Sequence, residues 1–183
     1  MSEPRRIGVT IDVKPHAYDP ALHPALFEGV LSRRIIAFFI DLLVIIAPVI
    51  LAAIVIFIFV LVTFGLAWPL LWLLSPGTVI WALFYYGATF AGPASATLGM
   101  RVMGLTMRTW YGAPCYFVLG AVHAILFWLS VGTLIFPILL VVGLFNPRRR
   151  LLHDILLGTV VINGAPLTAA PVTPAGNRDA KVL

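Results

Sequence analysis

Residues 35–63 read IIAFFIDLLVIIAPVILAAIVIFIFVLVT and contain a single charged residue, Asp41. A helix needs about 20 apolar residues to cross the hydrocarbon core of a bilayer, and this run is longer. Pro48 is expected to kink the helix, and tilt accommodates its surplus length. The stretch therefore predicts a membrane-spanning helix.

The composition of the whole chain supports the same fold class. Hydrophobic residues make up 61% of the 183 residues and charged residues only 10%, against roughly 45–50% and about 25% in soluble domains. No Asp, Glu, Lys or Arg lies between Asp41 and Arg101, or from Thr109 to Pro147. We expect an all-α integral membrane protein, and Cys115, the lone cysteine, excludes an internal disulfide framework.

Three further apolar stretches are candidate spans: residues 70–91, 116–131 and 133–146. Five basic residues precede the first span, two lie between the second and third stretches, and five follow Pro147. Because Lys and Arg collect on the cytoplasmic side, all three groups belong on one side, which requires an even number of crossings. We predict a bundle of four helices, with three as the alternative.

The remaining segments predict the domain organisation. Residues 1–24 carry several prolines without apolar periodicity and are expected to form a flexible cytoplasmic leader. The membrane domain then covers residues 25–163, with a glycine-containing interfacial loop at 92–105 and a C-terminal interfacial helix at 148–160. Residues 164–183, rich in Ala, Pro and Thr, are expected to be disordered.

The net charge of +5 predicts contact with a membrane surface and not with nucleic acid, since the basic residues flank apolar runs and no DNA-binding motif is present. We expect a multi-pass protein of a cell membrane of the bacterial inner type, with cytoplasmic N- and C-termini. Its partners would be the lipid bilayer and either further copies of the chain or another membrane protein.

Asp41 is the strongest functional signal, because a carboxylate inside an apolar helix is costly unless it has a use. Arg34, Ala37 and Asp41 follow one another at i, i+3 and i+7, so they share one helix face. That face carries a cation at its rim and an acid six residues beyond the start of the span, about 9 Å deep at the usual helical rise.

The chain resembles the RDD family of membrane proteins, which is named for one arginine and two aspartates. The family's first motif is matched by Arg34, Ala37 and Asp41. Its central glycine motif and its closing motif are matched by Thr97, Gly99, Arg101, Gly104 and Leu105, and by His153, Asp154, Gly158 and Thr159. Met100 stands where the family commonly has lysine. The resemblance covers roughly residues 27–162, and what it implies about function is limited to a suspected transport role.

Two interpretations of Asp41 remain open: a carboxylate that binds a proton or cation in a wet cavity, or a structural ion pair with Arg34 or Arg101. Asp154 is expected to offset Arg150 or to cap the loop that contains Arg101. His153 precedes it directly, and adjacent helix positions do not face each other.

His123 lies alone in an apolar stretch, where it is either a proton relay or a neutral histidine bonded to a backbone carbonyl. Arg148, Arg149 and Arg150 are candidates for contact with anionic lipid, or serve only as a topology signal. The sequence predicts no metal site, no cofactor and no enzymatic activity, because no catalytic motif is present.

Two functional hypotheses follow. The first is a small transporter of a proton, a monovalent cation or a small solute, in which Asp41, Asp154 and His123 form the binding site. The second is a non-catalytic membrane module that assists the assembly or stability of other membrane components. There, Arg34, Asp41, Arg101 and Asp154 would form a structural charge network.

Overall fold

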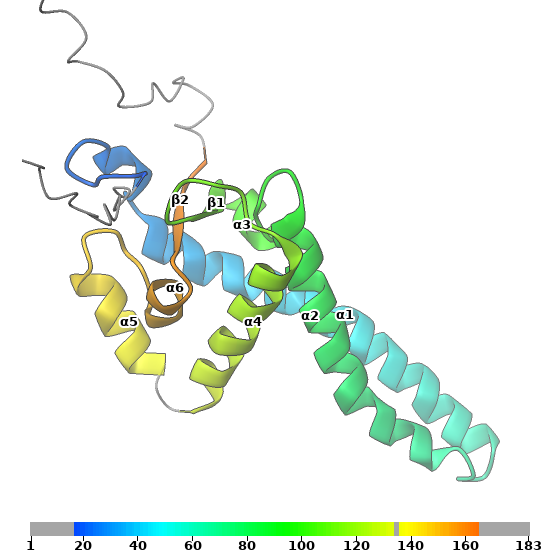
Figure 1. Ribbon diagram of the computed structural model, residues 1–183. Coiled ribbons are helices and arrows are strands. Elements are labelled where there is room, and N and C mark those ends of the chain that lie inside the picture. Colours follow the sequence, from blue (N-terminus) through cyan, green and yellow to red (C-terminus); the bar gives the residue numbers. More distant parts are fainter. Residues whose placement is uncertain (1–16, 134–135, 165–183) are drawn as a thin grey trace, which may run out of the picture.

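Two long helices form a hairpin that projects from the rest of the molecule (Figure 1). The computed structural model describes residues 17–133 and 136–164. Helix α1 covers Val30–Val62, and α2 covers Leu74–Ala91 after the short 3-10 helix η2, Trp68–Leu73. Pro48 lies inside α1, as the sequence predicted. The first helix begins five residues earlier than expected, directly after Gly29, which has a left-handed backbone conformation.

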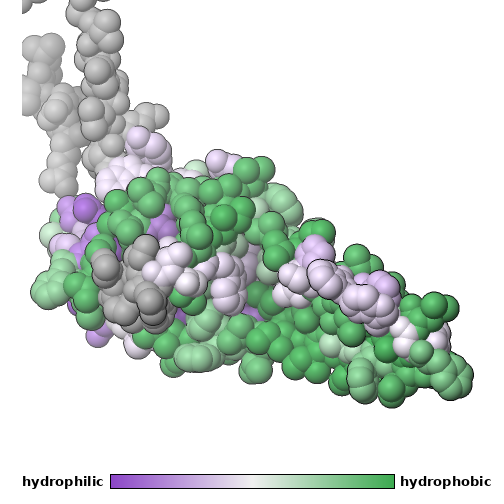
Figure 2. Space-filling model, turned by 90° about the horizontal axis from the view of Figure 1, so that it is seen from below, coloured by the Kyte–Doolittle hydropathy of each residue, from purple (hydrophilic) through white to green (hydrophobic). Residues whose placement is uncertain are grey.

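Both arms of this hairpin are long and apolar enough to cross a membrane. The first such segment covers Pro24–Val62 and the second Trp68–Ala91. Large apolar side chains such as Ile50, Leu51 and Ile54 are more than half exposed, which suits a lipid environment and not water. Figure 2 shows apolar residues over much of the hairpin surface, with weakly hydrophilic residues along part of it and the most hydrophilic residues gathered at the other end of the molecule.

The last two predicted spans, residues 116–131 and 133–146, correspond to two shorter helices, α4 (Phe117–Gly132) and α5 (Phe136–Phe145). The sequence predicted this division. At the usual rise of about 1.5 Å per residue, however, α4 is about 24 Å long and α5 about 15 Å, both shorter than a hydrocarbon core of about 30 Å. The described residues therefore contain two helices of spanning length, and the predicted total of four is not confirmed.

Helix α4 packs along α2 through two glycines. A Cβ atom on Gly87 would lie 2.7 Å from the ring of Phe117, and one on Gly120 would lie 2.8 Å from Cβ of Phe90. Small residues let helices approach closely, which is the usual means of packing where lipid supplies no hydrophobic driving force. This contact fixes α4 against the base of the hairpin.

A two-stranded antiparallel sheet, which the sequence did not predict, joins two distant segments. Strand β1 (Leu105–Thr109) pairs with β2 (Thr159–Asn163) in the register Leu105↔Asn163 to Thr109↔Thr159. The predicted interfacial helix at 148–160 is wrong: only α6 (Leu152–Leu156) is helical, and β2 begins three residues later. The predicted interfacial loop contains a helix, α3 (Leu98–Val102), before β1 begins.

The segment that precedes α1 is packed against this sheet. Tyr18, Leu26, Phe27, Val160 and Ile162 form a small buried cluster, and the short 3-10 helix η1 covers Pro24–Leu26. The prediction of a flexible leader is therefore wrong for residues 17–24, while residues 1–16 lie outside the described part. The predicted disordered tail also lies outside it, except for Gly164, which donates a backbone hydrogen bond to Gly104.

Candidate functional site: a buried charge cluster beside an apolar cavity

Asp41 is buried and accepts hydrogen bonds from three donors. The Tyr85 hydroxyl lies 2.5 Å from Oδ1, the Gly99 amide 2.7 Å from Oδ1, and the Thr97 hydroxyl 2.6 Å from Oδ2. Thr97 is also the N-cap of α3, because its Oγ1 accepts from the amide of Met100 at 3.1 Å. A carboxylate at a helix N-terminus is stabilised by the exposed amides there. Asp41 therefore fastens α3 to the first half of α1.

The close approach of α3 to α1 explains the alanine three residues after Arg34. A Cβ atom on Gly99 would overlap the carbonyl oxygen of Ala37, so only glycine fits at this crossing. Ala37 itself is 2% exposed. The small pair Ala37 and Gly99 brings the α3 N-terminus within reach of Asp41.

Arg34 does not pair with Asp41 but with Asp154, which lies 120 residues away in the chain. Its Nη1 donates to Oδ2 at 2.5 Å and its Nη2 to Oδ1 at 3.1 Å, a two-pronged contact. The side chain of Asp154 is fully buried and that of Arg34 is 12% exposed. Oδ2 also accepts from the amide of Leu151 at 3.0 Å. This pair joins the start of α1 to α6.

Two histidines complete the cluster around Asp154. Nδ1 of His123 lies 3.7 Å from Asp154 Oδ1, and Nε2 of His153 lies 3.5 Å from the same oxygen. The two imidazole rings meet edge to face, with centroids 4.6 Å apart. Within the described residues, His123 Nδ1 and both ring nitrogens of His153 have no hydrogen-bond partner. The expected backbone-carbonyl partner for His123 is absent at Nδ1, and His153 does approach its neighbour Asp154.

Burial and the neighbouring charges shift the pKa values of Asp154 and His153. Burial alone would raise the pKa of Asp154, but Arg34 and the two histidines outweigh it and hold that pKa well below its usual range. Burial lowers the pKa of His153 to about 4, although Asp154 acts in the opposite direction. At neutral pH Asp154 is therefore an anion and His153 is uncharged.

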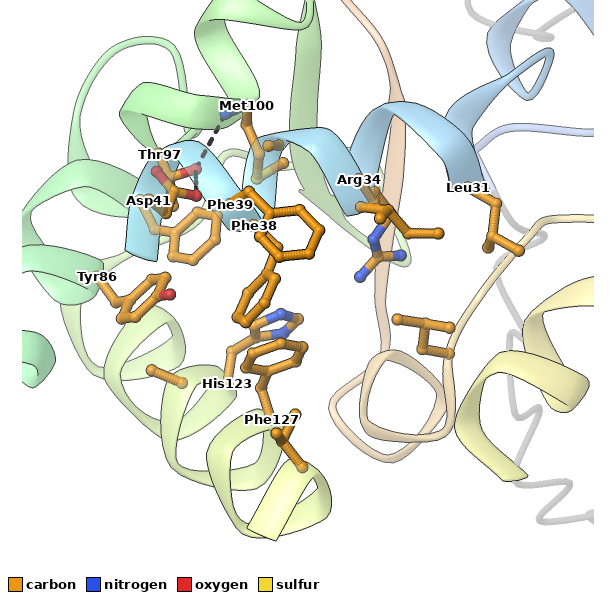
Figure 3. A pocket seen from close by; sticks show the side chains of 16 residues that line it. Leu31, Arg34, Phe38, Phe39, Asp41, Tyr86, Thr97, Met100, His123 and Phe127 are labelled. Atoms are coloured by element: carbon orange, nitrogen blue, oxygen red, sulfur yellow. Dashed lines mark hydrogen bonds between the residues drawn. The ribbon is translucent and has the colours of Figure 1, made fainter. Parts of the chain in front are cut away.

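A cavity of about 470 Å³ lies between α1 and α4 and reaches both polar clusters. Figure 3 shows Phe38, His123 and Phe127 lining its middle, with Asp41 toward one end and Arg34 toward the other. The rest of the lining is almost entirely apolar: Leu31, Ile35, Ala37, Phe39, Tyr86, Phe90, Thr97, Met100, Ala124, Val131 and Leu151. The cavity is therefore mostly apolar, with the ionisable residues Arg34, Asp41 and His123 in its lining.

The other predicted site residues lie outside this cavity. Arg101 is exposed and donates from Nε to the carbonyl of Ala96 at 3.0 Å. Arg150 is buried, donates to the carbonyls of Thr159 and Asp154, and lies over the ring of Trp110 at 4.5 Å. It contacts the backbone of Asp154 and not its carboxylate, and its burial contradicts a role in lipid contact.

The two remaining arginines of the triplet are less buried. Arg148 lies 5.5 Å from the Trp110 ring, and Nη1 of Arg149 donates to the carbonyl of Leu144 at 2.7 Å. Contact of either side chain with anionic lipid stays a prediction.

A family model described as RDD family matches residues 29–158. The chain belongs to the RDD family. No curated protein and no solved structure matches it.

The three residues for which the RDD family is named belong to two different contacts. The first aspartate, Asp41, binds α3, whereas the arginine, Arg34, binds the second aspartate, Asp154. The closing His-Asp motif places His153 and Asp154 in the buried cluster. Met100, which replaces the common lysine, is itself buried and lines the cavity. In this RDD chain that position therefore adds apolar surface in place of a charge.

Sequence reasoning missed Tyr85 as a partner of Asp41. Tyr85 and Tyr86 are polar-tipped residues inside an otherwise apolar helix, and a buried hydroxyl usually finds a hydrogen-bond partner. That was the available signal. The convergence of His123 with His153 had no local signal, because the two residues lie in separate helices of the RDD domain.

Proposed function

We propose that this RDD-family protein is a membrane transport protein that binds a cation at the cluster formed by Asp154, His123 and His153. The observation that carries the proposal is the set of buried ring nitrogens without hydrogen-bond partners beside a buried carboxylate. Buried polar atoms in folded proteins are almost always paired, and an unpaired set calls for an explanation such as a ligand ion. His123 also lines the cavity, so the cluster has a route of access.

The proposal moves the binding site away from Asp41. Its two oxygens already accept three short hydrogen bonds from Tyr85, Thr97 and Gly99. A cation there would have to displace donors that also cap α3, at a cost of order 1–3 kcal/mol for each buried group left unpaired. We assign Asp41 a structural role and Asp154 the binding role.

A second candidate is a non-catalytic module that assists the assembly or stability of other membrane components. The observation in its favour is the hairpin, whose apolar side chains are widely exposed along α1 and α2. Such a surface can contact lipid, further copies of this chain or another membrane protein. On this alternative the charge cluster would only hold α1, α4 and α6 together.

Both candidates share the same setting, which is part of the proposal. We place the protein in a cell membrane of the bacterial inner type, as a multi-pass protein with both termini in the cytoplasm and without enzymatic activity. Supporting this are the basic residues that flank the apolar stretches, since Lys and Arg collect in cytoplasmic loops.

The deciding experiment is cation flux into proteoliposomes, measured for a panel of monovalent and divalent cations. His123→Phe removes the ring nitrogen that would bind the cation but leaves the Arg34–Asp154 pair in place. His23→Gln is the matched control, because His23 is an exposed histidine far along the chain from the cluster. Transport predicts a flux with the unaltered protein that is lost in His123→Phe and kept in His23→Gln.

In the same experiment, Asp41→Asn tests whether Asp41 has a structural role. If Asp41 is structural, this variant inserts in lower yield or unfolds more easily, while the folded fraction keeps its flux per molecule. Absence of flux for every cation tested, from well-folded unaltered protein, would contradict transport and favour the assembly module.

A further inference from the structure

We propose that the cluster is a binding site for a divalent transition-metal ion of the zinc class, with His123 Nδ1, His153 Nε2 and Asp154 Oδ1 as its ligands. This inference rests on the proposed function and names the class of cation. The proposed ligands lie in α4 and α6, next to the start of α1.

The distances suit such an ion. Zinc holds nitrogen and oxygen ligands at about 2.0–2.2 Å in a tetrahedron, so neighbouring ligand atoms lie about 3.4 Å apart. Asp154 Oδ1 lies 3.7 Å from His123 Nδ1 and 3.5 Å from His153 Nε2. All three ligand atoms lie within 4.8 Å of one another. The two distances to Oδ1 are within a few tenths of an ångström of that value, whereas the two histidine nitrogens, up to 4.8 Å apart, would have to approach each other by as much as about 1.4 Å.

The chemistry of the ligands selects the class of ion. Two imidazoles and one carboxylate suit Zn²⁺ and its first-row neighbours, whereas Mg²⁺ and Ca²⁺ prefer oxygen ligands. A monovalent alkali ion would gain little from two ring nitrogens.

Arg34 positions the carboxylate ligand. Its Nη1 and the Leu151 amide occupy Oδ2 of Asp154, while Oδ1 accepts only the longer bond from Nη2 and points toward both histidines. Carboxylate ligands of metals are commonly held by such outer hydrogen bonds. The guanidinium charge also weakens cation binding at short range, which favours reversible occupancy over a permanent structural ion.

The cavity supplies the fourth position. Three protein ligands with one open position are typical of zinc sites that exchange a ligand, whereas structural sites have four protein ligands. His123 and Arg34 both line the cavity, so water or another small ligand can reach an ion held by His123.

The test uses the full chain in lipid nanodiscs without a polyhistidine tag, titrated with Co²⁺, which gives visible absorption bands when bound in a tetrahedral site. Displacement by Zn²⁺ then gives the zinc affinity. We expect stoichiometric binding by the unaltered protein and by His23→Gln. His123→Phe should raise the Kd for Co²⁺ more than about 100-fold, since loss of even an outer hydrogen-bond partner costs 10–100-fold.

His153→Gln is the second variant, and X-ray absorption at the cobalt edge of the unaltered protein is the second measurement. The edge spectrum should show two imidazoles in the first coordination sphere, which needs no variant to fold. Absence of visible bands from folded unaltered protein, or equal Co²⁺ affinity in His123→Phe, overturns the metal site.

The two proposals fail separately. Metal binding without flux of any cation would overturn transport and leave the metal site intact. Flux of monovalent cations by a protein that binds no Co²⁺ would overturn the metal site and leave transport intact.

Discussion

The two halves of helix α1 differ in what their residues contact. From Val30 to Ile45 the helix buries Val30, Ala37, Asp41 and Ile45, and it holds both α3 and α6 through polar contacts. From Ile46 to Val62 the same helix has no buried residue. Its exposed side chains need only be apolar, because lipid accepts any apolar surface, while Val49, Ala53, Ile56 and Val60 form a half-buried stripe. Packing therefore constrains the sequence more strongly in the first half than in the second.

Of the substitutions in α1, we expect the largest loss of stability from one at Arg34. Arg34→Met leaves the buried Asp154 carboxylate without its partner, which costs about 3–5 kcal/mol in the free energy of unfolding. Arg33→Met, one residue earlier on an exposed side chain that bonds Asn163 at 3.2 Å, should cost less than about 1 kcal/mol. Unfolding of both variants in detergent checks the pair. Equal destabilisation would remove the distinction between the two arginines.

A pair of isoleucines compares the two halves directly. Ile45→Ala empties a side chain that is 3% exposed and should cost about 2–5 kcal/mol. Ile54→Ala changes a side chain that is 51% exposed and should stay within about 0.5 kcal/mol. Thermal unfolding of the two variants in one detergent is the measurement. A larger loss at Ile54 would show that this side chain also packs against protein.

A substitution at the crossing of α3 over α1 should cause a smaller loss of stability. Gly99→Ala forces α3 away from Ala37 and should cost about 1–3 kcal/mol. Gly77→Ala is the matched control, since a Cβ there meets no atom within 4 Å and alanine favours the helix. Chemical denaturation measures both. Comparable stability of the two variants would mean that α3 is not fixed at this crossing.

Hydropathy predicted α1 and α2 because a membrane helix must be apolar along its whole length, and that requirement is visible in a single segment. It predicted a helix over residues 148–160, which is longer than α6, and it did not predict β2, since residues 152–163 are mostly apolar and short enough to suit several structures. The β-branched residues Thr159, Val160, Val161 and Ile162 were a signal for a strand, but its partner β1 lies some fifty residues away.

The candidate site was predicted in part. Arg34, Asp41, His153 and Asp154 could be named from motifs, but their partners could not. Helical spacing placed Arg34 and Asp41 on one face and suggested that they pair. The pairing of Arg34 with Asp154 depends on tertiary structure across 120 residues, which no local pattern encodes.

The smallest effect expected is at Cys115. Burial raises the pKa of its thiol to about 12, so almost none of the reactive thiolate is present at neutral pH. Maleimide should label the folded protein far more slowly than the unfolded protein, as followed by mass spectrometry. Equal labelling rates would show that the region between β1 and α4 opens freely.

The most direct test is a double-mutant cycle between Arg34 and Asp154, using Arg34→Met, Asp154→Asn and the double variant. In the structure the arginine and the second aspartate of the RDD family bind each other, and the arginine does not bind the first aspartate. We therefore predict a coupling in the upper part of the range of about 0.5–3 kcal/mol that contacting pairs show in unfolding free energies. Effects that add within about 0.5 kcal/mol would contradict it.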